Sequence, residues 1–487
     1  MYQTLGQVFT NAGVQAPPES FGITVVPDPN DPSKQTRPHQ LTGLRNSLEQ
    51  GSYGLWDDPG TGKSLISYLR TAHGILTGKK VLAVMPPGLS WQYLLKFNEQ
   101  IKGHGFTGKV MDLGPSGRQY EFTKYNVYGW PDLLIIGYQM FLRCVGDLPR
   151  GVYSVFVADE AHALKNPSSR TYKTFRQFTE GGEVLYMTGS PAPTTPEDGY
   201  GLISLLTPDA YRSKRAFDRI HLVKVQKGNF RVTVGFRNLD RLSKNLYLKA
   251  RRVTKEDVLD LKKPNVIPID VVLDEAHQSK YTQLMEERVL EHGDELINAV
   301  QGAAMRRYAM TLCSFPHLIT KYKKKSQMLV ALDALLESIN LAETKIVIFA
   351  SYVDTVENLG EYLKEYNPAL IYGGSDTHAN KNKFIEDPSC RVAIINPQAG
   401  GAGLDGLQGV AHNLMFFEPV GSPGIMDQCA SRLIRSGQEH VVNVYLMRVR
   451  RTLYMRAVNS VLMSRVHDYK STLVSPGDFL EELLGSI

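Results

Sequence analysis

Short apolar runs alternate with amphipathic stretches along two separate parts of this 487-residue chain. In the first part, from about residue 36 to 210, the runs have the length and continuous apolar character of strands buried in a parallel sheet. Helical stretches such as 64–74 and 168–178 lie between them. This alternation predicts a doubly wound α/β lobe. The strands expected in it are 81–84, 133–136, 155–157 and 184–187.

A second α/β pattern occupies residues 326–487 and ends in helices. Its apolar runs also have strand length, so we expect a second lobe of the same kind. The predicted fold class is therefore α/β, with two tandem lobes that are parallel sheets flanked by helices. The strands expected in the second lobe are 345–350, 369–372, 392–395, 413–417 and 442–446.

Four segments complete the predicted organisation. Residues 1–35 carry five prolines and predict an irregular N-terminal arm. Residues 211–263 break the alternation and predict a basic helical insertion in the first lobe. The apolar run 266–273 is expected to return a strand to that lobe, which gives it the boundaries 36–274. Residues 275–325 have apolar positions near helical spacing and predict a helical protrusion or linker.

The formal charge of the chain is +6, and it is unevenly distributed. Between Arg212 and Lys263, sixteen lysines and arginines stand against five aspartates and glutamates. Such a segment on a slightly acidic body is expected of a polyanion-binding surface, and a solvated lysine-rich loop is the alternative. Aromatic residues within it can stack on bases, although the small core of a helical insert is the favoured interpretation. They are Tyr211, Phe217, Phe230, Phe236 and Tyr247.

Cysteine usage and hydropathy favour an intracellular protein. The four cysteines lie far apart, which argues against a disulfide framework and against a zinc knuckle. No apolar run approaches the roughly 18 residues of a membrane helix, and residues 1–13 lack the features of a signal peptide. We expect a cytoplasmic location in a bacterium or virus and a possible nuclear one in a eukaryote. The basic run 321–325 is either a nuclear address or a solvated helix end.

A glycine turn followed by Lys63 and Ser64 is the first chemical motif. Glycines allow backbone N–H groups to close around phosphate oxygens, and the N-terminus of the following helix adds further donors. Lys63 would contact the β- and γ-phosphates, and the Ser64 hydroxyl would bind Mg²⁺. A chance glycine-lysine-serine turn is the alternative. The residues expected to hold the nucleotide here are Asp58, Pro59, Gly60, Thr61, Gly62, Lys63 and Ser64.

A pair of carboxylates, Asp159 and Glu160, follows 96 residues after Lys63. The pair ends an apolar run and so lies at the carboxyl end of a strand, where ligands bind in open α/β sheets. Asp159 would hold Mg²⁺, and Glu160 would orient or deprotonate the attacking water. The same tetrapeptide recurs at Asp274, where it opens a helical stretch. We interpret that copy as a helix N-cap.

Together these segments resemble Swi/Snf-related ATPases within the superfamily-two helicases. The resemblance covers about residues 36–450 and departs from the family pattern at Pro397 and Gln398, where the fifth motif usually has a hydroxyl residue and an arginine. It implies two RecA-like lobes. The stretches that carry it, in chain order, are 37–40, 57–64, 85–87 with Trp91, 159–169, 188–191, 349–352, 399–404 and 428–438.

The resemblance also implies roles for individual residues. Arg37 and Gln40 would read adenine, with an exposed helix position as the alternative for Gln40. Arg432 and Arg435, three apart on one predicted helix face, would reach the γ-phosphate; a basic helix face without a catalytic role is the alternative. The residues implied to couple the lobes are His162, Thr188, Gly189, Ser190 and Gln428; a buried structural histidine is the alternative for His162. The implied nucleic-acid contacts are Pro86, Pro87, Trp91, Ser351, Gly400, Gly401, Arg251 and Arg252.

The function expected from the resemblance is that of an ATP-dependent motor with ATP and Mg²⁺ as cofactors. It would move along duplex or branched DNA, with remodelling, strand annealing or branch migration as the result, and without a membrane partner. A strand-separating DNA or RNA helicase is the first alternative. A binding module with a degenerate nucleotide site is the second.

Overall fold

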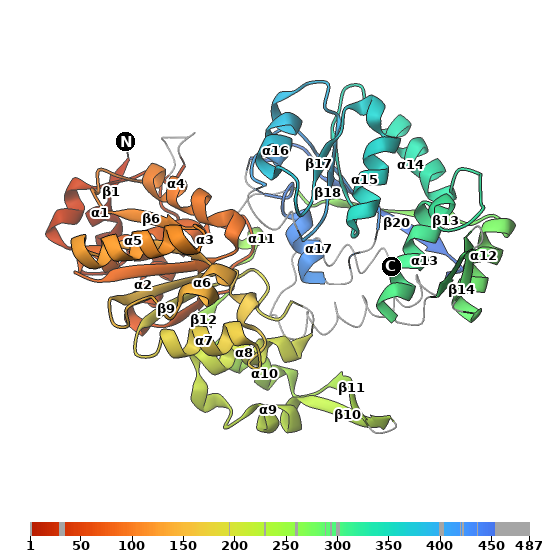
Figure 1. Cartoon of the computed structure of the whole chain (residues 1–487). Helices are drawn as coiled ribbons and strands as arrows, with labels where there is room; N and C mark the ends of the chain where they lie inside the picture. The colour runs from red at the N-terminus through yellow and green to blue at the C-terminus, as the bar shows by residue number, and fades with distance from the viewer. Residues whose placement is uncertain are drawn as a thin grey trace. The chain divides into compact units, whose positions relative to one another are not determined.

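The computed structural model describes residues 2–28, 35–193, 195–227, 230–258, 262–287, 289–292, 295–298, 302–398, 404–418, 420, 423–435 and 437–452. These residues form two compact units, and the described residues up to 258 belong to the first and those from 262 to the second. The predicted first lobe ended later, at residue 274. Each unit is built on one parallel sheet (Figure 1). No helix in this described part is long and apolar enough to cross a membrane.

The first unit contains a seven-stranded sheet in the order β12-β3-β9-β8-β4-β7-β6, and every neighbouring pair is parallel. All four strands predicted for this lobe are confirmed as β4, β7, β8 and β9. Strands β3, β6 and β12 were not predicted. The bounds are β3 Tyr53–Leu55, β4 Lys80–Met85, β6 Gly108–Met111, β7 Leu133–Gly137, β8 Tyr153–Asp159, β9 Glu183–Met187 and β12 Ala250–Arg251.

Helices separate these strands along the chain, as expected for a parallel sheet. The apolar residues of the central strands are buried, which explains why the strands are continuous apolar runs in the sequence. The α-helices are α2 Pro38–Gln50, α3 Lys63–Leu76, α4 Ser90–Gln100, α5 Pro115–Tyr128, α6 Tyr138–Cys144, α7 Arg170–Phe178 and α8 Gly199–Leu206. The 3-10 turns are η2 Pro87–Leu89, η3 Ala161–Leu164, η4 Pro196–Asp198 and η5 Pro208–Ala210.

The prediction of an irregular N-terminal arm is wrong for residues 2–28. Helix α1 (Leu5–Asn11) begins with a capping box in which Thr4 and Gln7 exchange hydrogen bonds. Its apolar side chains Leu5, Val8 and Phe9 are fully buried in the core of the first unit. The prolines of residues 2–28 lie outside α1, and Pro18 begins the 3-10 turn η1. The other elements are β1 Gln3–Thr4, η1 Pro18–Gly22 and β2 Thr24–Val25, and β2 pairs with both β1 and β5 (Ile101–Lys102).

The insertion after α8 is only partly helical, which corrects the prediction for 211–263. It contains an antiparallel hairpin of two strands and then returns to the first sheet through β12. The predicted small core is confirmed for Tyr211 and Phe217, which are buried with ring centroids 5.1 Å apart. The elements are α9 Lys214–His221, β10 Leu222–Lys227, β11 Phe230–Phe236, α10 Leu239–Leu246 and α11 Lys255–Val258.

The second unit contains a six-stranded parallel sheet in the order β13-β20-β19-β16-β18-β17. All five strands predicted for this lobe are confirmed. The bounds are β13 Asn265–Val272, β16 Ile346–Phe349, β17 Ala369–Ile371, β18 Val392–Ile395, β19 Asn413–Phe416 and β20 Asn443–Arg450. The helices are α12 Glu275–Glu287, α13 Gly302–Ser314, α14 Gln327–Ser338, α15 Val353–Tyr362, α16 Thr377–Glu386 and α17 Pro423–Ala430, with 3-10 turns η6 Pro316–Leu318, η7 Lys364–Tyr366 and η8 Leu407–Gly409.

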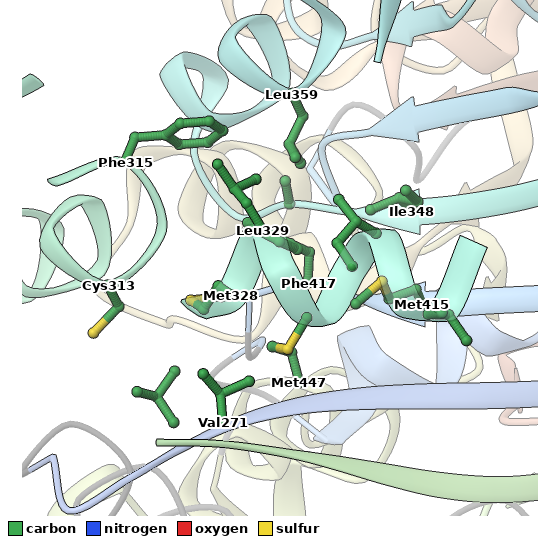
Figure 2. Packing of buried hydrophobic residues seen from close by; sticks show 14 of the residues in the cluster. Val271, Cys313, Phe315, Met328, Leu329, Ile348, Leu359, Met415, Phe417 and Met447 are labelled. Atoms are coloured by element: carbon green, nitrogen blue, oxygen red, sulfur yellow. The ribbon is translucent and has the colours of Figure 1, made fainter. Parts of the chain in front are cut away.

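Strand β13 corrects the prediction that residues 266–273 belong to the first lobe. It pairs in parallel with β20 along its whole length. Two ion pairs fix this edge, because Asp270 binds Arg448 at 2.9 Å and Arg450 at 2.5 Å. Val271 belongs to the same buried cluster as Met447 of β20 (Figure 2).

The segment 275–325 also belongs to the second unit. Helices α12 and α13 confirm the helical prediction, but their apolar side chains pack into the core with α14 instead of forming a protrusion. Tyr281, Leu284 and Leu312 are buried there, and Figure 2 shows Cys313 and Phe315 in the same cluster. A short hairpin, β14 Val289–His292 and β15 Glu295–Asn298, separates the two helices and was not predicted.

Candidate functional site

The loop between β3 and α3 has the backbone conformation that phosphate binding requires. Gly60 and Gly62 have φ angles of 89° and 90°, a region that favours glycine. Gly62 also caps the N-terminus of α3, so the free N–H groups of the first helical turn point into the loop. A Cβ atom at Gly62 would lie 2.3 Å from Nε2 of Gln40. Glycine is therefore required here both for conformation and for space.

The ammonium group of Lys63 folds back onto the loop. It donates to the carbonyl oxygen of Asp57 and, at 3.0 Å, to that of Asp58. Burial lowers the pKa of Lys63, and nearby carboxylates, Asp57 first and Glu160 next, oppose this effect. Because the Glu160 carboxylate acts on the Lys63 ammonium, the carboxylate pair and the loop lysine belong to one site. Ser64 follows on the exposed first turn of α3.

The N-terminus of α2 is attached to the same loop. Gln40 donates from Nε2 to the carbonyl of Gly62 at 3.3 Å, and its Oε1 accepts the backbone N–H of Arg37 at 2.9 Å. His39 contacts the carbonyl of Thr61 at 2.8 Å. Gln40 is only 6% exposed, so the alternative of an exposed helix residue is wrong. The adenine-reading role of Arg37 and Gln40 stays a prediction, and of the two it is Gln40 that contacts the phosphate loop.

Asp159 ends β8, and Glu160 follows it with φ 49°, a left-handed conformation that is uncommon outside glycine. The backbone N–H of Glu160 donates to Oδ1 of Asp159 at 2.9 Å. Burial raises the pKa of Asp159, the Glu160 carboxylate raises it further, and Lys63 acts in the opposite direction. A half-buried carboxylate next to a second one favours binding of a cation.

The donor set fits Mg²⁺. The Asp159 carboxylate and the Ser64 hydroxyl are hard oxygen donors, which this ion prefers. Within the residues that the structure describes, no cluster of three or more His, Cys, Asp or Glu side chains could enclose a metal. Mg²⁺ needs no such cluster in a triphosphate site, because it keeps waters and binds substrate phosphates with one or two protein oxygens.

His162 lies between the carboxylate pair and the residues that follow β9. Nδ1 of His162 lies 3.1 Å from Oε2 of Glu160 and 3.1 Å from the hydroxyl of Thr188. The same hydroxyl accepts the backbone N–H of Ser190 at 3.1 Å. Gly189 packs on the phosphate loop, since a Cβ atom there would lie 2.8 Å from Cδ of Pro59. The predicted contact between His162 and Thr188 is therefore present, and their coupling role stays a prediction.

Arg251 and Arg252 lie beneath the phosphate loop, which corrects their prediction as nucleic-acid contacts. Arg251 binds the carboxylate of Asp57 at 2.7 Å, and Arg252 binds that of Asp58 at 2.8 Å. All four side chains are buried or nearly so, with Arg251 at 12% and Asp57 at 1% exposure. Two arginines committed to buried carboxylates cannot also bind phosphates at the surface. The sequence offers no signal for this pairing across 194 residues.

The remaining nucleic-acid candidates of the first unit follow β4. Pro86 precedes the 3-10 turn that begins at Pro87, and Trp91 lies in the first turn of α4. The Trp91 side chain is 59% exposed, and its indole N–H donates to Asp112 at 2.7 Å. These residues lie at the carboxyl end of the sheet, as do Asp159 and Thr188, and their contact with nucleic acid stays a prediction.

In the second unit, Ser351 follows β16 and donates its backbone N–H to Glu418 at 2.7 Å. Glu418, which sequence reasoning missed, also accepts a hydrogen bond from the Thr355 hydroxyl at 2.8 Å. It is fully buried, and burial raises its pKa to about 7 despite these hydrogen bonds. Glu418 therefore fixes the turn from β16 into α15. Gly400 and Gly401 lie outside the described residues.

The two candidate arginine fingers do not lie on a helix, which corrects that prediction. Helix α17 contains Gln428 and ends at Ala430, and Arg432 and Arg435 lie in the turn that follows. Nη1 of Arg435 binds Asp405 at 2.6 Å. Their catalytic role stays a prediction.

The second acidic tetrapeptide is structural, as predicted. Oδ1 of Asp274 accepts the backbone N–H of His277 at 2.8 Å and so caps α12. Its other oxygen accepts from Tyr322 at 2.7 Å and from Gln327 at 3.0 Å. The Tyr322 hydrogen bond is the first of several that lower the pKa of Asp274.

Comparison with known proteins identifies the family. The model of the SNF2-related domain matches residues 39–328, more than half of the chain. The ISWI chromatin-remodeling complex ATPase CHR17 of Arabidopsis thaliana is 23% identical over 465 residues, which cover 88% of this chain and 41% of that protein. The DNA repair and recombination protein RAD54B of Gallus gallus is 24% identical over 519 residues, which cover 89% of this chain and 54% of that protein.

A solved structure, the Sulfolobus solfataricus SWI2/SNF2 ATPase core in complex with dsDNA, is 18% identical and covers 90% of this chain and 97% of its own, with a TM-score of 0.40. The chain spans about half or less of the length of the two curated relatives. The extent of the family match decides the assignment: the chain belongs to the SNF2-related domain family, whose ATPase domain it carries.

Proposed function

We propose that this ATPase couples hydrolysis of ATP to movement along duplex or branched DNA. The observation that carries the proposal is the position of His162, whose Nδ1 makes a hydrogen bond with the Thr188 hydroxyl and lies 3.1 Å from Oε2 of Glu160, next to the phosphate loop. His162 thus lies between the group that would act on water and the residue that follows the carboxyl end of β9. Hydrolysis would then change the structure of residues outside the nucleotide site itself.

Each residue of the site has a defined task in this proposal. The loop N–H groups and Lys63 bind the phosphates, and Glu160 orients the attacking water. Asp159 and Ser64 would hold Mg²⁺, which neutralises charge on the phosphates when bound. Arg432 and Arg435 would supply positive charge from the second unit, an effect that in arginine fingers is worth about 10³–10⁵ in rate.

The DNA part of the proposal is supported by charge and by relatives. The insertion is strongly basic, which suits contacts to phosphates without sequence readout. The names of the two curated relatives place them in chromatin remodelling and in DNA repair and recombination. Contacts of this kind suit a motor, because they allow it to move along any sequence.

The test is ATP hydrolysis measured with blunt duplex DNA, single-stranded DNA, RNA or no nucleic acid, at two salt concentrations. We expect the largest stimulation by DNA duplex, weakened at the higher salt, and little activity in Lys63→Ala and Glu160→Gln. Stimulation by RNA alone would overturn the DNA assignment. Unwinding of a forked duplex would show the strand-separating alternative. Equal hydrolysis by Lys63→Ala and wild type would show a degenerate nucleotide site.

A further inference from the structure

The β10–β11 hairpin of the insertion has two chemically different faces. Val225 lies directly opposite Val232, and Val223 lies opposite Gly235 on the same face by strand alternation. The other face carries Lys224 and Arg231. The register shifts between Val223 and Lys224, so that Val234 on β11 is an extra residue without a partner on β10. This bulge adds Val234 to the apolar side of the ribbon.

The valines of this hairpin are exposed in the first unit. Val223 is 38%, Val225 45%, Val232 41% and Val234 58% exposed. An antiparallel sheet normally packs one face on a core, but these two strands form a sheet of their own (Figure 1). A cluster of exposed β-branched residues on a polar ribbon is typical of a contact surface.

The base of the hairpin is firmly attached. His221 accepts the backbone N–H of Arg237 through its carbonyl at 2.9 Å, and its ring lies 2.7 Å from the Tyr211 hydroxyl. Lys224 binds Asp218 of α9 at 2.6 Å, and Leu222 is buried. The base of the hairpin is therefore attached to α9 and to the small core of the insertion.

The positive charge around the hairpin favours a polyanion as its ligand. From residue 211 to 250, eleven lysines and arginines stand against two acidic residues. Phosphates alone do not explain the valine face, because a continuous duplex keeps the faces of its bases stacked. Apolar base faces become accessible only where stacking is interrupted, at a fork or a junction, and apolar side chains are known to occupy such positions.

We propose that the hairpin binds DNA at a branch point, with Arg231 toward the phosphates and the valine face against the exposed base pair. This inference rests on the proposed function and names branched DNA as its substrate class. A motor with such an element would act preferentially where two strands part.

The test compares binding of a forked DNA with binding of a blunt duplex of equal length, without ATP. Val225→Thr with Val232→Thr keeps the shape and the strand preference of the side chains but adds hydroxyls. We expect this variant to lose about tenfold in fork affinity, and to bind blunt duplex as the wild type does. Arg231→Gln is the matched control; it should weaken both substrates equally and lower the salt slope by about one.

Two outcomes would overturn the inference. One is a fork preference that survives in the valine variant and in Val234→Thr, whose side chain is the most exposed of the four. The other is a self-associating wild type whose oligomer dissociates in these variants, since the face would then be covered by a second copy. Failure of duplex-stimulated ATP hydrolysis in the wild type would instead refute the proposed function, because fork binding is measured without nucleotide.

Discussion

Replacing Arg251 by methionine should destabilise the first unit without affecting electrostatic contacts to DNA. Methionine keeps an unbranched apolar stem but removes the guanidinium group that binds Asp57 at 2.7 Å and the carbonyl of His39. The Asp57 carboxylate, 1% exposed, would then be buried without its cation. Removal of one partner of a buried ion pair typically costs about 3–5 kcal/mol.

The lower end of this range applies, because the Arg251 side chain retains 12% exposure and some solvent screening. About 3 kcal/mol corresponds to a fall in melting temperature of roughly 6–12 °C for a unit of this size. Asp57→Asn should lower the melting temperature as well. The double variant should be less destabilised than the sum of the two single variants, because neither buried charge remains.

The assay is thermal unfolding of the three variants and the wild type, together with the salt dependence of duplex binding. Lys249→Ala is the matched control, since Lys249 is exposed two residues earlier in the chain. The control should change the stability by less than about 0.5 kcal/mol. A stable Arg251→Met protein whose salt slope falls by about one would refute the structural role and restore the assignment as a phosphate contact.

Three further predictions address the site and its support. Gly62→Ala should lower kcat/KM for ATP by at least about tenfold, because φ 90° is strained for alanine and its Cβ would meet Gln40; steady-state kinetics test this. His162→Ala should keep ATP binding but reduce the stimulation of hydrolysis by DNA, and adding Thr188→Val should cause little further loss, measured as the ratio of stimulated to unstimulated rates. Glu418→Gln should flatten the dependence of stability on pH. Burial raises the folded pKa of Glu418 to about 7, so its stabilisation is present below the ordinary value of 4.5 and is lost as pH rises through about 7. The effect is at most roughly 3 kcal/mol, and denaturant unfolding at pH 5 and pH 8 would detect it.

Burial decided which strands could be predicted from the sequence. Residues 81–84 and 133–136 are central strands with both faces covered, so every position is apolar and the run is conspicuous. Strands β3 and β12 have three and two residues, too few for any periodicity. Strand β13 was recognised as a strand but assigned to the wrong sheet. Its pairing with β20 is stabilised by ion pairs between Asp270 and two arginines that lie 178 and 180 residues away, and no local sequence pattern reveals such a pairing.

The same distinction applies to the candidate site. Lys63, Asp159 and Glu160 belong to short local motifs whose chemistry follows from residue type and spacing, and the structure brings them into one site. Glu418 is part of no motif that sequence reasoning used. Its importance comes from its burial and from the three hydrogen-bond donors that the turn after β16 and helix α15 supply to it. Local chemistry was predictable, and long-range pairing was not.

The least predictable pairing also connects the insertion to β3 and the start of the phosphate loop. Strand β12 runs beside β3, and backbone N–H groups of Gly54, Trp56 and Asp58 donate to carbonyls of the segment 249–253 at 2.9 Å each. The indole N–H of Trp56 donates to the carbonyl of Leu246 at 3.0 Å. These bonds attach the end of the insertion directly to the strand and loop that precede Lys63. A displacement of the phosphate loop would therefore act on the base of the insertion through these backbone hydrogen bonds. If the hairpin binds DNA as proposed, this backbone connection would couple its position to the state of the nucleotide.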